Sequence, residues 1–423
     1  MNKITMNHVR EEMYVHTLPS GFKIYLYPKN DFSRKTAMLQ INYGSIDQHY
    51  QHQEEFGSFH SGLAHFLEHM LFENTSMDIP KKFSELSASV NAFTTTNKTV
   101  YYFNTVDEFY EPLRLLLSFV FGASFDDEQI EKERKIIQSE IDMYSDELEQ
   151  NLYYDAMKSL YLTHPIRTDI AGTKEDVNLI SKEELMKAYL LFYLPSNAYL
   201  MLSGDFFPEE AIEVVNSFEV LVKENINEKC TVLFDKEDLT PVIPYHSQKK
   251  DMHTSLLMLS SKLDTMGMSQ KEIAILEFKY ILLLDNYFSK SSEYTEKLLK
   301  MRLINQSFDF SVTMDTSYAH LMFYAETKYP DKLARALLEM VEAMKDTPLD
   351  DARFQVQKKK LIGQFIHLFN SPQDSTGLIA DYDQKGILLD ELMETILNFS
   401  TVDLDELKIR LKKELFTKTI YHK

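Results

Sequence analysis

The pentapeptide His65-Phe66-Leu67-Glu68-His69 restricts what this chain can fold into more than any other part of its sequence. In an α-helix, side chains three and four positions apart lie on the same face, so His65, Glu68 and His69 would project together. Two imidazoles are ligands that Zn²⁺ prefers, and a carboxylate beside them can take a proton from water. Because the rest of the segment is apolar, residues 63–72 are predicted to form a buried helix.

A second predicted helix, over residues 127–144, offers the further carboxylates that such a site needs. It carries an apolar stripe of three isoleucines and a tyrosine, and Glu133 and Glu140 lie along the edge of that stripe. The two glutamates are seven residues apart, so they fall within about 20° of each other around the helix axis. Burying a lone carboxylate costs several kcal/mol unless it is paired or binds a metal. The alternative is that both side chains extend outward to solvent or pair with an arginine.

Together these residues predict a catalytic zinc site with one ion per chain. Such a site takes three protein ligands and leaves one position for water, and we predict His65, His69 and Glu140 as the ligands. Glu68 would accept the proton of a water whose pKa zinc lowers to roughly 7. Glu133 is the candidate hydrogen-bond partner of a ligating histidine, because such histidines normally have one.

Length and composition limit the class of protein. The chain has 423 residues, which predicts two domains of roughly 200 residues. Its net charge of −20 argues against a nucleic-acid partner, because phosphate binding needs clustered Lys and Arg. Cys230 is the only cysteine, which excludes a disulfide within the chain and favours a cytoplasmic location. A single cysteine also disfavours a structural zinc site, because structural zinc sites mostly include Cys. We expect no signal peptide in residues 1–17 and no membrane span, because no apolar run is long enough.

The two halves of the chain share a similar order of predicted elements, which favours a duplicated α+β unit. The predicted domains are residues 1–222, which carry the zinc motif, and residues 249–423, joined by a linker over residues 223–248. The first half is predicted to contain strands over 22–27, 37–43, 99–105 and 197–203 and helices over 106–121, 127–144, 152–160 and 181–192, the last opened by a capping box from Ser181 to Glu184. The second half is predicted to contain strands over 256–262, 307–313 and 320–326 and helices over 270–288, 331–345, 351–369, 376–388 and 402–411.

Several motifs in the first half resemble the inverzincin peptidases of the pitrilysin family, M16, and are most similar to its short members from Gram-positive bacteria. That family carries its outer and its liganding glutamate at the spacing of Glu133 and Glu140. The resemblance implies two tandem homologous domains, each an antiparallel-rich sheet packed on one side by helices. The matching motifs are residues 62–72, Asn91-Ala92-Phe93-Thr94, Glu133-Arg134-x-x-Ile137-x-x-Glu140, His164-Pro165, Gly172-Thr173, Tyr193-x-Pro195-Ser196-Asn197 and Gly204-Asp205.

The resemblance also implies how a substrate binds. Subunits of the family pair as clamshells around a closed chamber, and the substrate peptide adds to the edge strand that follows the zinc helix. Asn91, Ala92, Phe93 and Thr94 match that strand, and such β-augmentation gives affinity through backbone bonds without demanding a sequence. The alternative is an ordinary strand end with Asn91 as a turn residue. His164 precedes a proline and is predicted to be structural.

The second half departs from the family pattern at one place. Active members carry an Arg and a Tyr, seven residues apart, that hold the substrate carbonyl near the zinc, whereas Met301 and Phe308 stand at those places here. Arg302 is present one position later, but position 309 is Asp, and the Gly-rich turn before this region is missing. A Phe cannot donate the hydrogen bond that a Tyr hydroxyl gives to a developing oxyanion. We therefore predict a dimer in which a related subunit supplies the Arg–Tyr pair.

Two functions remain open from the sequence. The first is a zinc endopeptidase that hydrolyses peptides or unfolded segments, with a role in peptide or precursor maturation. The second is a non-catalytic subunit of the same family that binds peptides or scaffolds an assembly.

Overall fold

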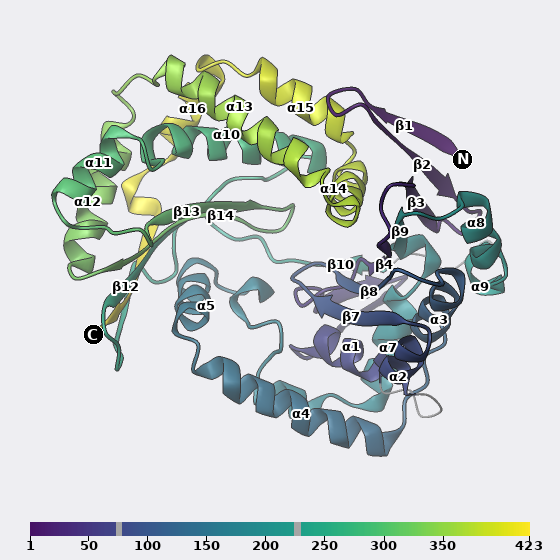
Figure 1. Ribbon diagram of the computed structural model, residues 1–423. Coiled ribbons are helices and arrows are strands. Elements are labelled where there is room, and N and C mark those ends of the chain that lie inside the picture. Colours follow the sequence, from purple (N-terminus) through teal and green to yellow (C-terminus); the bar gives the residue numbers. More distant parts are fainter. Residues whose placement is uncertain (73–77, 224–229) are drawn as a thin grey trace. The chain divides into compact units, whose positions relative to one another are not determined.

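The protein is described by a computed structural model that covers residues 1–72, 78–223 and 230–423 (Figure 1). Residues 224–229 of the predicted linker lie outside the described residues, and the predicted domain boundaries stay a prediction. By its internal contacts the chain divides into two compact units. Unit 1 comprises Met1–Tyr144, Thr168–Phe234 and Leu368–Asp381, and unit 2 comprises Ser145–Arg167, Asp235–His367 and Tyr382–Lys423.

Unit 1 contains a seven-stranded sheet with the strand order β1-β2-β3-β9-β4-β8-β7. All neighbouring strands are antiparallel except β3 and β9, which are parallel. Strand β7 ends this order, so among the described residues one of its edges has no strand beside it. The strands are β1 (Asn2–Met6), β2 (Glu11–Thr17), β3 (Lys23–Pro28), β4 (Lys35–Ile41), β7 (Ala88–Thr94), β8 (Thr99–Thr105) and β9 (Ala198–Gly204).

Helices pack against this sheet and enclose the core of unit 1. Alternate residues of β4 point into that core, so Ala37, Leu39 and Ile41 are all fully buried. Helices α1, α2 and α3 contact β7 or β8 (Figure 1). The helices are α1 (Leu63–Phe72), α2 (Ile79–Glu85), α3 (Tyr110–Val120), α4 (Asp127–Ser145), α6 (Lys174–Leu179), α7 (Lys182–Phe192), α8 (Pro208–Asn216) and α9 (Glu219–Val222), and a small second sheet joins β5 (His49–His52), β6 (Glu55–Ser58) and β10 (Thr231–Val232).

Unit 2 repeats the arrangement of unit 1. Its sheet has the order β11-β15-β12-β14-β13, with β11 and β15 parallel and every other pair antiparallel. This is the order and sense of β3-β9-β4-β8-β7, so the predicted α+β class with two tandem homologous units is confirmed. The strands are β11 (Tyr245–Lys249), β12 (Ser255–Lys262), β13 (Asp309–Met314), β14 (Ala319–Thr327) and β15 (Phe416–His422).

Both faces of the central strand of unit 2 are covered, since all eight residues of β12 are buried and α5 and α12 both contact it. The first of these, α5, comes from the first half of the sequence and lies in unit 2. The helices of this unit are α5 (Leu148–Leu160), α10 (Gln270–Phe288), α11 (Glu293–Lys300), α12 (Pro330–Ala343), α13 (Asp351–Leu368), α15 (Leu389–Asn398) and α16 (Val402–Arg410), while α14 (Pro372–Gln384) passes from unit 1 into unit 2.

Only half of the predicted capping box at the start of α7 forms. The Ser181 side chain accepts the backbone N–H of Glu184, as an N-cap should. The Glu184 carboxylate does not return to Ser181. It accepts the backbone N–H of His60 at 2.7 Å and lies 2.9 Å from His60 Nδ1. A tertiary partner has replaced the local one, and it ties α7 to the loop that leads into α1.

Candidate metal centre

Helix α1 places three polar side chains on one face because its other faces are buried in the core. Its buried residues are Leu63, Ala64, Phe66, Leu67, Met70 and Leu71. His65, Glu68 and His69 are half-buried. The i, i+3 and i+4 spacing in the sequence therefore places the three side chains on one face of the helix.

The start of α1 is fixed by two glycines that meet backbone to backbone. Gly62 has a φ of +84°, and a Cβ built on it would lie 2.4 Å from the carbonyl oxygen of Ala171. Gly172 has a φ of +80°, and its Cβ would lie 2.5 Å from the carbonyl oxygen of Ser61. Only glycine fits both the backbone conformation and the space at these two positions. The position of the histidines thus depends on a close contact between two loops.

Helix α4 is tied to α1 by a buried arginine that sequence reasoning left without a role. Arg134 lies with its guanidinium 5.5 Å from the ring centroid of Phe66 in α1. It donates hydrogen bonds to the carbonyl oxygens of Val177 and Ile180, the latter at 2.9 Å, at the end of α6. The sequence drew attention to Arg134, because it directly follows Glu133. The sequence could not identify Val177 and Ile180 as its hydrogen-bond partners, because they lie more than 40 residues away.

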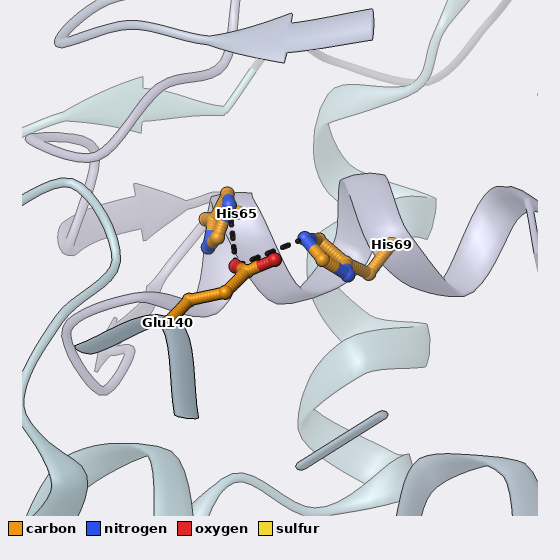
Figure 2. A group of neighbouring side chains, drawn as sticks. All are labelled: His65, His69 and Glu140. Carbon is orange, nitrogen blue, oxygen red and sulfur yellow. Dashed lines mark ion pairs between the residues drawn. The ribbon is translucent and has the colours of Figure 1, made fainter. Parts of the chain in front are cut away.

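The structure brings His65, His69 and Glu140 together (Figure 2). Glu140 Oε2 lies 3.9 Å from His65 Nε2 and 3.6 Å from His69 Nε2. The ligand atoms of the three residues all lie within 4.8 Å of one another, and this is the one such group of His, Cys, Asp and Glu among the described residues.

These distances fit a zinc ion. Donor atoms around a tetrahedral zinc, at about 2.0–2.1 Å from the metal, are roughly 3.3 Å apart. The two histidine–glutamate pairs, at 3.6 and 3.9 Å, therefore need to close by about 0.3 to 0.6 Å. The donor set of two imidazoles and one carboxylate is one that catalytic zinc uses, with a further position left for water. The site is also reachable from solvent, because the Glu140 side chain is 29% exposed.

Glu133 lies behind His69 and gives that histidine its outer partner. Its carboxylate oxygen Oε2 is 3.1 Å from His69 Nδ1, and its side chain is only 4% exposed. The Nδ1–H donates to this carboxylate, which leaves Nε2 free to face Glu140. Burial works against the charged ring, but the hydrogen bond to Glu133 and the charges of Glu140 and Glu68 outweigh it and raise the pKa of His69.

The two histidines differ in their surroundings. Burial, with a smaller contribution from the positive charge of His69, lowers the pKa of His65 to about 3. Its ring is therefore neutral at physiological pH, the form that binds a metal. Nδ1 of His65 is buried and has no hydrogen-bond partner within the described residues, so the outer partner that His69 has is not repeated for His65.

Glu68 lies beside the group and has a hydrogen-bond donor from another element. Thr94 Oγ1, at the end of β7, donates to Glu68 Oε2 at 2.5 Å. Burial raises the pKa of Glu68, the Thr94 hydrogen bond and the positive charge of His69 oppose this, and the charge of Glu140 adds to it. The sequence indicated Thr94 only as part of a strand, and its contact with Glu68 was not foreseen.

The predicted substrate strand is the free edge of the sheet of unit 1. Asn91, Ala92, Phe93 and Thr94 are the last four residues of β7, which pairs with β8 alone among the described strands. Asn91 Oδ1 accepts the backbone N–H of Ala92 at 2.8 Å. That N–H is a donor which a peptide added at this edge would otherwise take up.

The residues at the places of the missing Arg–Tyr pair lie in unit 2. Phe308 is buried and lies parallel to Phe323, with ring centroids 6.3 Å apart, so it belongs to the core of that unit. Met301 is exposed just after α11, and Arg302 follows it with a φ of 55°. His164 is buried, and its Nδ1 accepts the backbone N–H of Ile166 at 3.0 Å, which is a structural role.

Comparison with known proteins agrees with this geometry. Residues 29–173 match the sequence profile described as Insulinase (Peptidase family M16). The predicted resemblance to the M16 family is confirmed. The uncharacterized zinc protease YmfH of Bacillus subtilis (strain 168) is 28% identical over 424 residues, which cover 97% of this chain and 96% of YmfH. Zinc proteases of bacterial M16 type are thus similar to the chain over its whole length.

Solved structures with the M16 fold also match the whole chain. A protein of Alicyclobacillus acidocaldarius described as M16-like peptidase aligns with a TM-score of 0.90 and 25% identity, covering 97% of this chain and 98% of that one. A peptidase M16 inactive domain from Pseudomonas fluorescens aligns with a TM-score of 0.76 at 14% identity, which shows a common fold alone. None of the helices in the described residues combines the length and apolar character needed to cross a bilayer.

Proposed function

We propose that this chain is a zinc-dependent endopeptidase that hydrolyses peptides or unfolded segments. The observation that carries the proposal is the convergence of His65, His69 and Glu140, with Glu68 beside them on the same helix. We take the first three as the ligands of one zinc ion per chain and Glu68 as the catalytic base. Glu133 is then the residue that orients His69.

Zinc, when bound, supplies an acidified water and polarises the scissile carbonyl. The chain's own part is to move a proton. Glu68 takes a proton from the water and later gives it to the amine that leaves as the peptide bond breaks. His65 and His69 would serve as ligands, each through an unprotonated ring nitrogen. Glu68 stands one turn or less from both histidines, which is where a base for that water must lie.

The edge of β7 is the proposed substrate site. An extended peptide that adds there bonds through its backbone, so affinity does not depend on sequence. The side chain of Asn91 must first release the N–H of Ala92. Phe93 is 40% exposed, which leaves its ring available to substrate side chains. This arrangement suits peptides and unfolded segments, because most backbone N–H and C=O groups of a folded domain are already paired with one another.

We further propose that the chain works as the zinc-bearing subunit of a clamshell dimer, with a related subunit supplying the Arg–Tyr pair. The support is that Phe308 has no hydroxyl and is packed in the core of unit 2. A role in peptide or precursor maturation follows from the kinship with short bacterial members. The free thiol of Cys230 favours a reducing compartment, and we propose the cytoplasm.

A non-catalytic subunit that binds peptides or scaffolds an assembly is the second candidate. One observation favours it: the fold is shared with an M16 inactive domain. The intact set of His65, Glu68, His69 and Glu140 favours the enzyme, because a scaffold has no need of a base beside a metal site.

The substitution Glu68→Gln separates the two candidates. It keeps the size of the side chain but removes the base, so we expect zinc content to stay the same while cleavage of an unfolded peptide stops. Glu85→Gln, on the exposed end of α2, is the matched control and should cleave as the wild type does. Both are assayed with and without a related subunit that carries the Arg–Tyr pair. A wild type that binds zinc and cleaves no peptide under either condition would leave only the scaffold.

A further inference from the structure

The carboxylate of Glu68 is held by a side chain from outside its own helix. In the part of the chain that the structure describes, one hydrogen bond reaches this carboxylate, and it comes from Thr94 Oγ1 at 2.5 Å. A hydroxyl has one proton, and an ionised carboxylate can only accept, so Thr94 is the donor. The distance is typical of a charge-assisted O–H···O⁻ bond, the strong class of hydrogen bond.

Thr94 is itself fixed by the strand that pairs with its own. Its Oγ1 lies 3.3 Å from Oγ1 of the fully buried Thr99. Thr99 donates its one hydroxyl proton to the carbonyl oxygen of Tyr43 at 2.9 Å, so the two hydroxyl oxygens are in contact but share no proton. Thr94 and Thr99 are direct partners in the register of β7 and β8. The hydroxyl that faces Glu68 therefore belongs to a rigid part of the sheet and not to a loose loop.

The turn that follows Thr94 is also held from outside. The backbone N–H groups of Ser45 and Ile46 donate to the carbonyl oxygens of Thr95 and Thr96, each at 3.0 Å. A Cβ on Gly44 would lie 2.4 Å from the carbonyl oxygen of Thr96, so the two loops are in direct backbone contact. This contact sets where β7 ends and hence where the hydroxyl of Thr94 points.

We propose that Thr94 is a positioning residue whose hydroxyl holds Glu68 Oε2 and so leaves Oε1 to take the proton from water. This inference rests on the proposed peptidase function. Without the hydrogen bond the glutamate side chain would sample several rotamers, and only some of them direct an oxygen toward the water. The proton that Oε1 accepts from water passes to the leaving amine, and the bond between Thr94 and Oε2 persists through both steps.

The same residue ends the proposed substrate strand. A peptide that binds along β7 would therefore lie at a fixed position relative to Glu68. The reason is that Thr94 is the last residue of the strand and also donates a hydrogen bond to Glu68. Substrate and base would be placed by one rigid element. This gives Thr94 a function through its side chain that is separate from any backbone contact of β7 with the peptide.

The first test is structural and does not depend on turnover. Crystal structures of the zinc-loaded full chain are compared for the wild type, Thr94→Val, Thr94→Ser and Ser89→Ala. Valine has the shape of threonine without the hydroxyl, serine keeps the hydroxyl, and Ser89 is an exposed hydroxyl earlier on the same strand. We expect one conformation of Glu68 in the wild type, T94S and S89A, and several conformations, or one turned away from β7, in T94V.

The second test measures kcat and KM on an unfolded fluorogenic peptide, with and without a related subunit that carries the Arg–Tyr pair, and bound zinc is determined for each variant. A hydrogen bond to a charged group implies that T94V loses about 10- to 100-fold in kcat. KM and zinc content should stay within about twofold of the wild type, and T94S should recover kcat to within about threefold. A purely structural role of Thr94 would change zinc content or thermal stability instead.

Two results overturn the inference. One is a T94V chain in which Glu68 keeps the wild-type conformation. The other is a T94V chain with unchanged kcat, including the case in which only KM rises, which would assign Thr94 to peptide binding alone. Failure of the peptidase proposal looks different: the wild type would bind zinc and cleave nothing, and the conformations of Glu68 would still decide whether Thr94 positions it.

Discussion

The contact between Glu133 and His69 predicts how strongly a residue outside the ligand set controls zinc binding. The Glu133 side chain is 4% exposed, and its carboxylate is 3.1 Å from His69 Nδ1. Glu133→Gln keeps an oxygen that can accept the Nδ1–H but removes the charge. A hydrogen bond to a charged group contributes about 1.5–3 kcal/mol and one between neutral groups about 0.5–1.5 kcal/mol. The difference is about 1–1.5 kcal/mol, so we expect zinc affinity to fall roughly tenfold.

Glu133→Ala should have the larger effect. It removes the acceptor altogether and leaves a buried Nδ1–H without a partner, which costs about 1–3 kcal/mol in addition to the lost orientation of the ring. We expect a loss of up to about 100-fold in zinc affinity, the upper end of what outer partners of metal ligands usually contribute.

The assay is a competition titration of the metal-free chain against a chelator of known zinc affinity at pH 7.5. Glu128→Gln, at an exposed position in the first turn of α4, is the matched control and should bind zinc as the wild type does. The reasoning is refuted if E133Q binds zinc within twofold of the wild type. It is also refuted if E133Q and E128Q lose equal affinity, since a general charge effect would then explain both.

Three further predictions concern the support of the site and the stability of unit 2. Gly62→Ala should lower the free energy of unfolding by about 2–4 kcal/mol, because a Cβ there meets the carbonyl oxygen of Ala171 in a left-handed conformation, and a denaturant titration checks this. Arg134→Met should cost about 2–4 kcal/mol in the same titration, because it leaves two buried carbonyl groups unpaired; an unchanged midpoint would contradict the role given to Arg134. Burial lowers the pKa of His164 and of His320 to about 4, so the unfolded chain takes up protons first as the pH falls below 6.5. The free energy of unfolding should therefore drop by about 2 kcal/mol for each histidine by pH 5. A free energy of unfolding that stays constant over this pH range would be the contrary result.

Elements with a strong local signal were predicted from the sequence. Strand β8 and helix α10 have the bounds that their patterns predicted, and α1 was recognised from apolar residues around its histidines. The strands β1, β2, β11 and β15 were missed. For β11 and β15 the pairing depends on partners far along the chain, since β15 pairs with β11 and β12 from more than 150 residues away. Strands β1 and β2 pair with each other, and β2 also pairs with β3, so they were missed although their partners are local.

The candidate site was predicted as far as helix geometry reaches. The spacing within α1 and within α4 predicted that His65, His69, Glu133 and Glu140 belong to one site. It did not predict that the two glutamates differ in burial. Both glutamates are on one side of α4, but the Glu133 side chain lies against His69 and is 4% exposed, whereas the Glu140 side chain is 29% exposed. The contact of Thr94 with Glu68 joins a hairpin to a helix across 26 residues, and no local pattern specifies such a contact.

Diffraction at the zinc absorption edge from crystals of the zinc-loaded chain tests the central claim most directly. The account predicts one anomalous peak per chain, about 2.0–2.2 Å from His65 Nε2, His69 Nε2 and a carboxylate oxygen of Glu140, with Glu68 beside it and not bound to it. A chain that shows no peak there in excess zinc, or a peak held by Glu68 or by a different set of residues, would contradict the account.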